Sequence, residues 1–410
     1  MYIAASRTSD LADGTHRKPA LKRVSANVVA LGMVSLVTDV SSEMVTAVLP
    51  LYLVLGLGLN PLQFGLLDGL YAGATAVVRV LGGHLADRWR RLKAVAGFGY
   101  GLSAVCKLGL VAAGSSVAAI GLVLAADRTG KGLRTGPRDA LISLSSEPAT
   151  LGRSFGVHRA MDTVGAFLGP LVAMAVLALS LGSYPSVFVT SFCIAAIAVL
   201  LLALFVRDRP GSVDRAAVSA RAALGLLKQQ DFRRVTLWAA LLGLVTVGDS
   251  FVYLVLQRRW EIAATYFPLL PLGTAGVYLL LAVPLGKLAD RVGRWPVFLG
   301  GHAALCLALV LLCGPQAGLW LAVVALALHG VFYAATDGVL MAAAGPLIPA
   351  GLRATGLAVV QTGQAVARML SSVLFGLAWT LWDLRPAVLV AAVCLAAVAL
   401  AAAVAKPVRP

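Results

Sequence analysis

The chain has 410 residues, 60% of them hydrophobic and only 13% charged, and its formal net charge is +16. Soluble domains usually carry about 25% charged residues, so this composition excludes a water-soluble globular protein. A membrane-spanning helix needs about 20 apolar residues, and the length therefore accommodates about twelve such helices with short loops. We expect the positive charge in loops on one side of a membrane, with the lipid bilayer rather than nucleic acid as its partner.

Long apolar runs define the predicted membrane spans. Each run must be a helix, because the bilayer offers backbone groups no hydrogen-bond partner outside the helix itself. In chain order the predicted spans cover 25–56, 62–86, 94–114, 117–145, 155–180, 186–206, 235–256, 264–289, 296–314, 317–345, 354–380 and 386–405. This pattern predicts an N-terminal tail over 1–24, a six-helix bundle over 25–206, a linker over 207–234, a second bundle over 235–405 and a tail over 406–410.

Lysine and arginine are distributed unevenly between the two sets of loops. If the N-terminus is inside, the outer loops hold only Arg258, Arg259 and Arg385. The cytoplasmic segments then hold Lys22, Arg23, Arg88, Arg90, Arg91, Lys93, Arg153, Arg207, Arg209, Arg233, Arg234, Arg291, Arg294, Arg353, Lys406 and Arg409. Positively charged loops stay on the cytoplasmic side, which predicts a multi-pass protein with both termini in the cytoplasm.

The two halves of the chain repeat a short sequence. The run Gly83-His84-Leu85-Ala86-Asp87-Arg88 follows the second span, and Gly286-Lys287-Leu288-Ala289-Asp290-Arg291 follows the eighth, about half a chain length later. A weaker echo joins the segments 152–156 and 352–356 at nearly the same offset. Matched pairs at one offset indicate a duplicated six-helix unit.

The repeated segment, written G-x-L-A-D-R-x-G-R, resembles the signature loop of the major facilitator superfamily. The second copy fits from Gly286 to Arg294, whereas the first has Arg90 where the pattern has glycine. The resemblance covers the whole chain. It implies an all-α membrane protein of twelve transmembrane helices in two pseudo-symmetric six-helix bundles, working as a secondary transporter and not as an enzyme.

In this superfamily the loop is taken to latch one conformation of the transporter. Carried over residue by residue, the resemblance assigns a conformational latch to Gly83, Asp87, Arg88, Gly286, Asp290, Arg291, Gly293 and Arg294. An aspartate at a helix end can accept charge-assisted hydrogen bonds that form in one state and break in another. The alternative is that the two aspartates only anchor their loops.

The fifth span contains Gly165-Ala166-Phe167-Leu168-Gly169-Pro170, which resembles the G-x-x-x-G-P motif of drug/proton antiporters. Glycines four residues apart let helix backbones approach closely, and the proline permits a kink. The resemblance implies a hinge at Gly165, Gly169 and Pro170. It also implies an efflux protein of the bacterial plasma membrane, which is called the inner membrane in bacteria that have two membranes. Simple close packing of two helices is the alternative.

Charged residues inside the predicted spans are the candidates for chemistry, because each costs about 2.5–3.5 kcal/mol at the membrane centre unless it is paired or hydrated. Asp39 and Glu43 are four residues apart and share one helix face, which suits a proton site tuned by Arg128. A static network pairing the two acids with Arg128 and Lys131 is the alternative. The full predicted set for proton coupling and the substrate cavity is Asp39, Glu43, Arg79, Asp127, Arg128, Lys131, Asp249 and Arg368. His158, His302 and His329 occur singly and are expected to be packing or interfacial residues.

Two hypotheses for the cargo remain open. The first is proton-coupled efflux of small molecules or drugs by alternating access, with the proton as coupling ion, no other cofactor and a monomeric protein. The second is transport of an anionic solute or a metal chelate through a basic central cavity, supported by Arg79, Lys107, Arg128, Lys131, Arg134 and Arg138. The five cysteines lack the spacing of metal ligands, and no hydrolase or nucleotide-binding motif is present, so neither a metal site nor an enzyme is expected.

Overall fold

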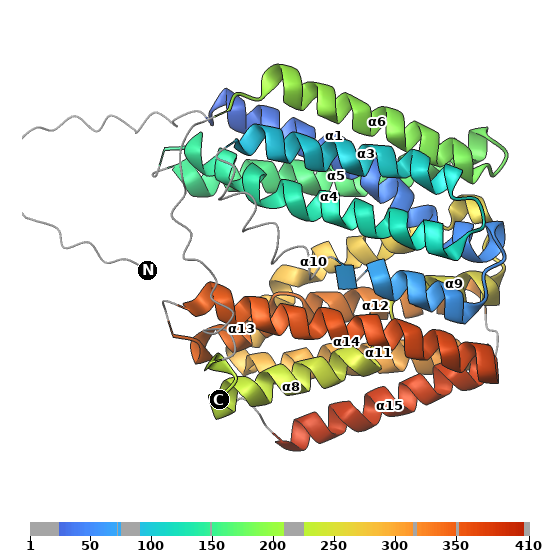
Figure 1. The fold of residues 1–410 in the computed structure, drawn as a ribbon. Helices are drawn as coiled ribbons and strands as arrows, with labels where there is room; N and C mark the ends of the chain where they lie inside the picture. The colour runs from blue at the N-terminus through green and yellow to red at the C-terminus, as the bar shows by residue number, and fades with distance from the viewer. Residues whose placement is uncertain are drawn as a thin grey trace, which may run out of the picture.

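The computed structural model describes residues 24–71, 73–74, 91–147, 150–208, 225–314, 318–349 and 352–405, and every regular element in them is a helix (Figure 1). The first half holds α1 (Ala26–Leu51), a π-helical continuation (Tyr52–Gly56), a helix over 61–71, α3 (Leu92–Ala112), α4 (Val117–Leu144), α5 (Leu151–Leu179) and α6 (Tyr184–Phe205). The second half holds α8 (Gln230–Val245), α9 (Asp249–Trp260), α10 (Leu269–Val292), α11 (Arg294–Cys313), α12 (Leu319–Thr336), α13 (Val339–Ala344), α14 (Arg353–Trp382) and α15 (Leu384–Ala405).

Ten helical stretches in the described part of the chain are long and apolar enough to cross a membrane. Two of the twelve predicted spans are not among them. The span over 62–86 lies largely outside the described residues, and α4 carries too many charged side chains, including Asp127, Arg128 and Lys131, to count as apolar. The structure therefore confirms an all-helical membrane protein and agrees with the expected number of spans.

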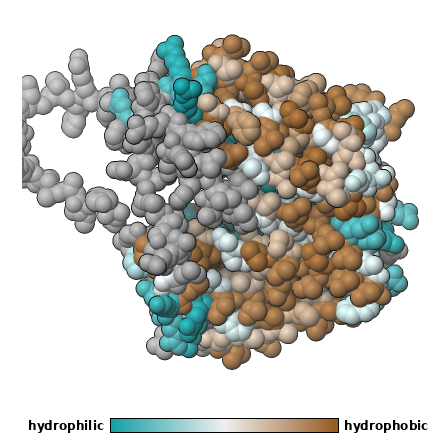
Figure 2. Space-filling view, in the orientation of Figure 1, coloured by the Kyte–Doolittle hydropathy of each residue, from teal (hydrophilic) through white to brown (hydrophobic). Residues whose placement is uncertain are grey.

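The visible face of the molecule carries a broad apolar band with polar residues at its two ends (Figure 2). Large hydrophobic side chains lie exposed along the helices, among them Leu122, Leu204, Leu280 and Leu400. In water such a surface would be an aggregation liability, whereas a bilayer covers it. The band is the face that contacts lipid.

The helices form two bundles (Figure 1). In the first, α1 packs against α5 and α6, and α3 packs against α4 and α6. In the second, α12 packs against α10 and α11, α15 against α11, and α14 against α8. The bundles meet where α5 contacts α10, where α1 contacts α9, and where the helix over 61–71 lies against α14. The last contact is very close, because a Cβ added at Gly69 would lie 2.7 Å from the backbone oxygen of Met369.

Two of the predicted spans are broken, where continuous helices over 235–256 and 317–345 were expected. The first stops at Val245 and resumes at Asp249, and the second stops at Thr336 and resumes at Val339. Gly338 takes a φ of 73°, a conformation that glycine adopts at little cost. Interrupted helices at membrane depth are tolerated where they line a cavity or are buried in protein. Both interruptions border the cavity described next.

Candidate functional site

A cavity of about 670 Å³ lies between the two bundles. Its walls come from α1, the helix over 61–71, the break between α8 and α9, α10, the break between α12 and α13, and α14. The volume is within the range of about 300–1,000 Å³ that small-molecule sites usually have. Both halves of the protein thus contribute to a single site, as a compartment for a transported solute requires.

Of the two acids on α1, only Glu43 is among the residues that line this cavity. Asp39 lies one helical turn earlier. Behind Glu43 stands α5, whose Gly169 is so near that an added Cβ would lie 2.6 Å from the Cβ of Glu43. A Cβ at Gly165 would collide with the backbone of Leu36. The glycines of the fifth span therefore provide the close packing of α5 on α1 directly behind the cavity wall, and a hinge there remains a prediction.

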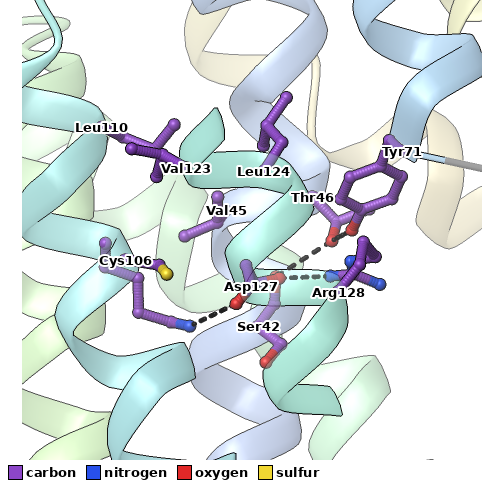
Figure 3. A pocket seen from close by; sticks show the side chains of 11 residues that line it. Ser42, Val45, Thr46, Tyr71, Cys106, Leu110, Val123, Leu124, Asp127 and Arg128 are labelled. Atoms are coloured by element: carbon purple, nitrogen blue, oxygen red, sulfur yellow. Dashed lines mark hydrogen bonds and ion pairs between the residues drawn. The ribbon is translucent and has the colours of Figure 1, made fainter. Parts of the chain in front are cut away.

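Asp127 is the centre of a buried charge cluster between α3 and α4 (Figure 3). Its carboxylate lies 2.7 Å from Nη2 of Arg128 and 3.6 Å from Nζ of Lys107, and it accepts a hydrogen bond of 2.6 Å from the hydroxyl of Ser103. The guanidinium of Arg128 stacks over the ring of Tyr71, at 3.9 Å from its centroid. A small pocket of about 20 Å³ adjoins these side chains.

This cluster differs from the pairing considered for the first and fourth spans. Arg128 forms its ion pair with its chain neighbour Asp127, and among the described residues no ion pair joins Asp39 or Glu43 to Arg128 or Lys131. The reason is geometric, since α3 brings Lys107 against α4, so that Asp127 can satisfy two cations at once. A static ion-pair network between α1 and α4 is therefore not found in the described part of the chain.

A second polar cluster surrounds Asp249, the first residue of α9, on the cavity wall. The hydroxyl of Tyr333 donates a hydrogen bond to its carboxylate, and Nε2 of His329 lies 3.4 Å from the same oxygen. Arg368 on α14 interacts electrostatically with both Asp249 and Tyr333. Sequence reasoning named Asp249 and Arg368 for the cavity and treated His329 as a packing residue.

The expectation that His329 is a simple packing residue was incomplete. Its ring is fully buried, but Nδ1 lies 3.3 Å from the hydroxyl of Thr274 while the other nitrogen faces Asp249. A signal was present in the sequence, because His329 and Tyr333 are four residues apart and share one face of α12. Only the packing of α12 against α9 identifies Asp249 as their common partner.

The two halves are joined beside the cavity by polar and aromatic contacts. The hydroxyl of Ser372 on α14 donates a hydrogen bond of 2.7 Å to Asp68, which belongs to the other half. The rings of Phe64 and Phe251 also meet edge to face, with 4.9 Å between their centroids, and Phe251 contacts Phe375 in the same way. These contacts join the two halves, and the helix over 61–71, α9 and α14 that carry them extend to the end remote from the start of α1 and the end of α15 (Figure 1).

The second copy of the repeated loop lies at the opposite end, between α10 and α11. Gly293 has a φ of 103°, which makes the sharp turn that separates the two helices. Asp290 lies 3.5 Å from Arg294, and Arg294 donates a hydrogen bond of 2.7 Å to the carbonyl of Ala342 in α13. The loop is therefore tied to the short helix that follows the break in the tenth span. The predicted residues Arg79, Gly83, Asp87 and Arg88 lie outside the described residues.

Two bundles of membrane helices that enclose a polar cavity define a membrane transporter. A sequence model of the Major Facilitator Superfamily matches residues 31–277 and 255–410, and the chain belongs to this superfamily. An uncharacterized MFS-type transporter of Methanocaldococcus jannaschii is 28% identical over 371 residues, 87% of this chain and 89% of that protein. An uncharacterized protein of Mycobacterium tuberculosis is 34% identical over 212 residues, 49% of this chain and 51% of its own length.

Solved structures share the fold at low sequence identity. The nucleoside transporter NupG superposes with a TM-score of 0.77 at 16% identity, covering 91% of this chain and 97% of NupG. A bacterial homologue of the human lysosomal transporter Spinster, in an inward-facing and occupied conformation, gives a TM-score of 0.72 at 17% identity, covering 93% of this chain and 96% of its own. Among the described residues, no group of His, Cys, Asp or Glu side chains is arranged to hold a metal ion.

Proposed function

We propose that the protein is a proton-coupled exporter that exchanges protons for small molecules by alternating access. The observation that carries the proposal is the position of Glu43, whose side chain belongs to the wall of a cavity shared by both halves. A carboxyl group at this position can bind a proton or contact a solute. If the proton and the solute compete for this carboxyl group, binding of one displaces the other, and this negative coupling leads to exchange.

Charged groups of both signs surround Glu43. Arg128 and Lys131 on α4, Tyr71 on the second span and Asp39 on α1 all interact with it electrostatically. Asp39 serves in this proposal as the neighbour that modulates Glu43.

Alternating access requires the two halves to part at one end while they close at the other. The Asp68–Ser372 bond and the aromatic layer of Phe64, Phe251 and Phe375 join the halves at the end remote from the termini. With both termini in the cytoplasm, as the distribution of positive charge favours, that end is the outer one, and this conformation is inward-open. The expected location is the plasma membrane of a bacterium, with the loops at 83–91 and 286–294 as cytoplasmic latches.

Transport into proteoliposomes tests the proposal. We would impose a pH gradient on vesicles that contain the full-length protein, add candidate solutes one at a time, and record proton release with a pH-sensitive dye inside the vesicles. Glu43→Gln is expected to abolish solute-dependent proton movement while it retains exchange of labelled for unlabelled solute across the membrane. Asp39→Asn is expected to slow coupled transport, and Asp231→Asn, at an exposed position on α8, serves as the matched control.

A Glu43→Gln protein that still couples solute movement to protons at the parental rate would overturn the assignment of the proton site. The orientation is tested separately, by protease accessibility of tags at the two ends of the chain in right-side-out cells. Tags found on opposite faces of the membrane would contradict both the orientation and the even number of crossings.

A further inference from the structure

The described lining of the central cavity has more acidic than basic side chains. Glu43 and Asp68 reach it from the first half, and Asp249 and Asp337 reach it from the second. Among the lining residues that the structure describes, Arg368 is the basic one. A solute that enters this cavity therefore meets a surface on which carboxyl groups predominate.

Arg368 faces acidic partners on the same wall. It interacts electrostatically with Asp249, with Asp337 and with Tyr333, whose hydroxyl donates to the carboxylate of Asp249, so one arginine faces two of the four lining acids. The acids of the lining other than Asp249 are Glu43, Asp68 and Asp337. In the described ranges the ion pairs of lysine and arginine involve Asp127, Asp139, Asp162 and Asp290, and these three acids take part in none of them.

The partners that Asp68 and Asp337 do have are neutral hydroxyl groups. Ser372 donates to Asp68 at 2.7 Å, and Tyr278 donates to Asp337 at 3.3 Å. A hydrogen bond from a hydroxyl satisfies one lone pair of a carboxylate and leaves its negative charge uncompensated. Asp68 is half-buried and Asp337 is exposed. A cation attracts a carboxylate in either place, and more strongly at the half-buried one, because Coulomb interactions are stronger there than in water.

Four of the basic residues that would suit an anionic solute have partners within the protein, whereas Lys131 interacts electrostatically with Glu43 and Asp39. Lys107 and Arg128 pair with Asp127, at 3.6 and 2.7 Å. Arg134 is 3% exposed and lies 4.7 Å from the centroid of an aromatic ring, and Arg138 bonds to Asp139 at 3.0 Å. Through these contacts, and through the hydrogen bond from Arg138 to Ser35, the cations link α4 to α3, to α1 and to Tyr71. The hypothesis of a basic central cavity for an anion or a metal chelate loses support for this reason.

The remaining walls suit an aromatic or apolar body. Tyr71, Tyr253, Phe267 and Tyr333 line the cavity. Aromatic faces attract organic cations by about 0.5–2 kcal/mol each, depending on how well the site excludes water. We propose that the transported solute is an organic cation, a protonated amine or a quaternary centre attached to an aromatic or apolar body, held between Asp68 and Asp337. The proposal rests on the proposed exchange function, since such a cation would compete with protons for the same carboxylates.

Equilibrium binding to the full-length protein in detergent tests the substrate class without any gradient. The probes are tetraphenylphosphonium and tetraphenylborate, which have nearly the same shape and opposite charge. We expect saturable binding of the phosphonium alone. Asp68→Asn and Asp337→Asn are each expected to weaken it about tenfold or more, as loss of one charge-assisted contact implies, while Asp231→Asn leaves it unchanged.

Each other result has a defined meaning. Equal binding of both ions, binding of the borate alone, no saturable binding of the phosphonium by folded protein, or unchanged affinity in both acid variants would overturn the cationic substrate. Folding of each variant is checked by size-exclusion chromatography, and because two acids are tested separately, loss of one variant still leaves a decisive measurement. If the phosphonium binds as expected but an imposed pH gradient does not drive it across proteoliposomes, the exchange function fails and the substrate class stands.

Discussion

Asp127 is the only anion of the described charge cluster between α3 and α4. Replacing it by asparagine leaves Lys107 and Arg128 without their anionic partner. At 3.6 Å the attraction between Lys107 and Asp127 amounts to about 5 kcal/mol at an effective dielectric constant of about 20, and that of Arg128 at 2.7 Å is larger. Desolvation of the charges offsets part of this energy. Removing one partner of a buried ion pair typically costs about 3–5 kcal/mol, because the other partner is left charged and buried.

The assay is thermal unfolding of the purified protein in detergent, followed by tryptophan fluorescence and by loss of the monodisperse chromatographic peak. A control is the exposed pair of Asp290 with Arg294 at 3.5 Å, whose side chains are 68% and 38% exposed. A surface pair contributes about 0–1 kcal/mol, so Asp290→Asn is expected to melt close to the parent. Asp127→Asn is expected to melt several degrees lower.

A double variant separates the ion pair from general damage to the helix. The double variant Lys107→Met, Asp127→Asn removes both charges of the pair, so that no unpaired lysine stays buried. We expect it to recover part of the stability lost by Asp127→Asn alone. The reasoning would be refuted if Asp127→Asn melted at the parental temperature, or if the double variant lost the sum of the two single effects.

Three further predictions concern packing, closure and the latch. Gly165→Ala places a Cβ against the backbone of α1 and is expected to cost about 1–3 kcal/mol, whereas Gly156→Ala, with no neighbouring atom within 4 Å, stays near the parent in the same melting assay. Ser372→Ala removes the bond to Asp68 that joins the halves and is expected to raise the population of the state open at that end by about tenfold, measured as spin-label distances across it; an unchanged distribution would argue against a closing role. Asp290→Asn is expected to slow transport while insertion and folding stay normal, and a complete loss of folded protein would favour the anchoring role instead.

Much of the architecture follows from local composition. Apolar runs of about 20 residues leave a bilayer-spanning chain no choice but helix, so the spans are readable without tertiary information. The breaks at 246–248 and 337–338 were not predicted, because a few Thr, Gly and Asp residues inside an otherwise apolar run do not by themselves end a membrane helix. A break at membrane depth is tolerated where it borders a cavity or is buried in protein, and the cavity here forms only when the two bundles pack together.

Within the site, the sequence by itself determined which charged residues had to be explained, since any charge inside an apolar span needs a partner or water. It could not determine the partners, because helix spacing places residues only on a face of their own helix. Tertiary structure decided that Asp127 pairs with Lys107 and Arg128, that Glu43 rather than Asp39 lines the cavity, and that His329 and Tyr333 meet Asp249. These contacts join segments far apart in the chain, and the packing of helices against one another is what brings them together.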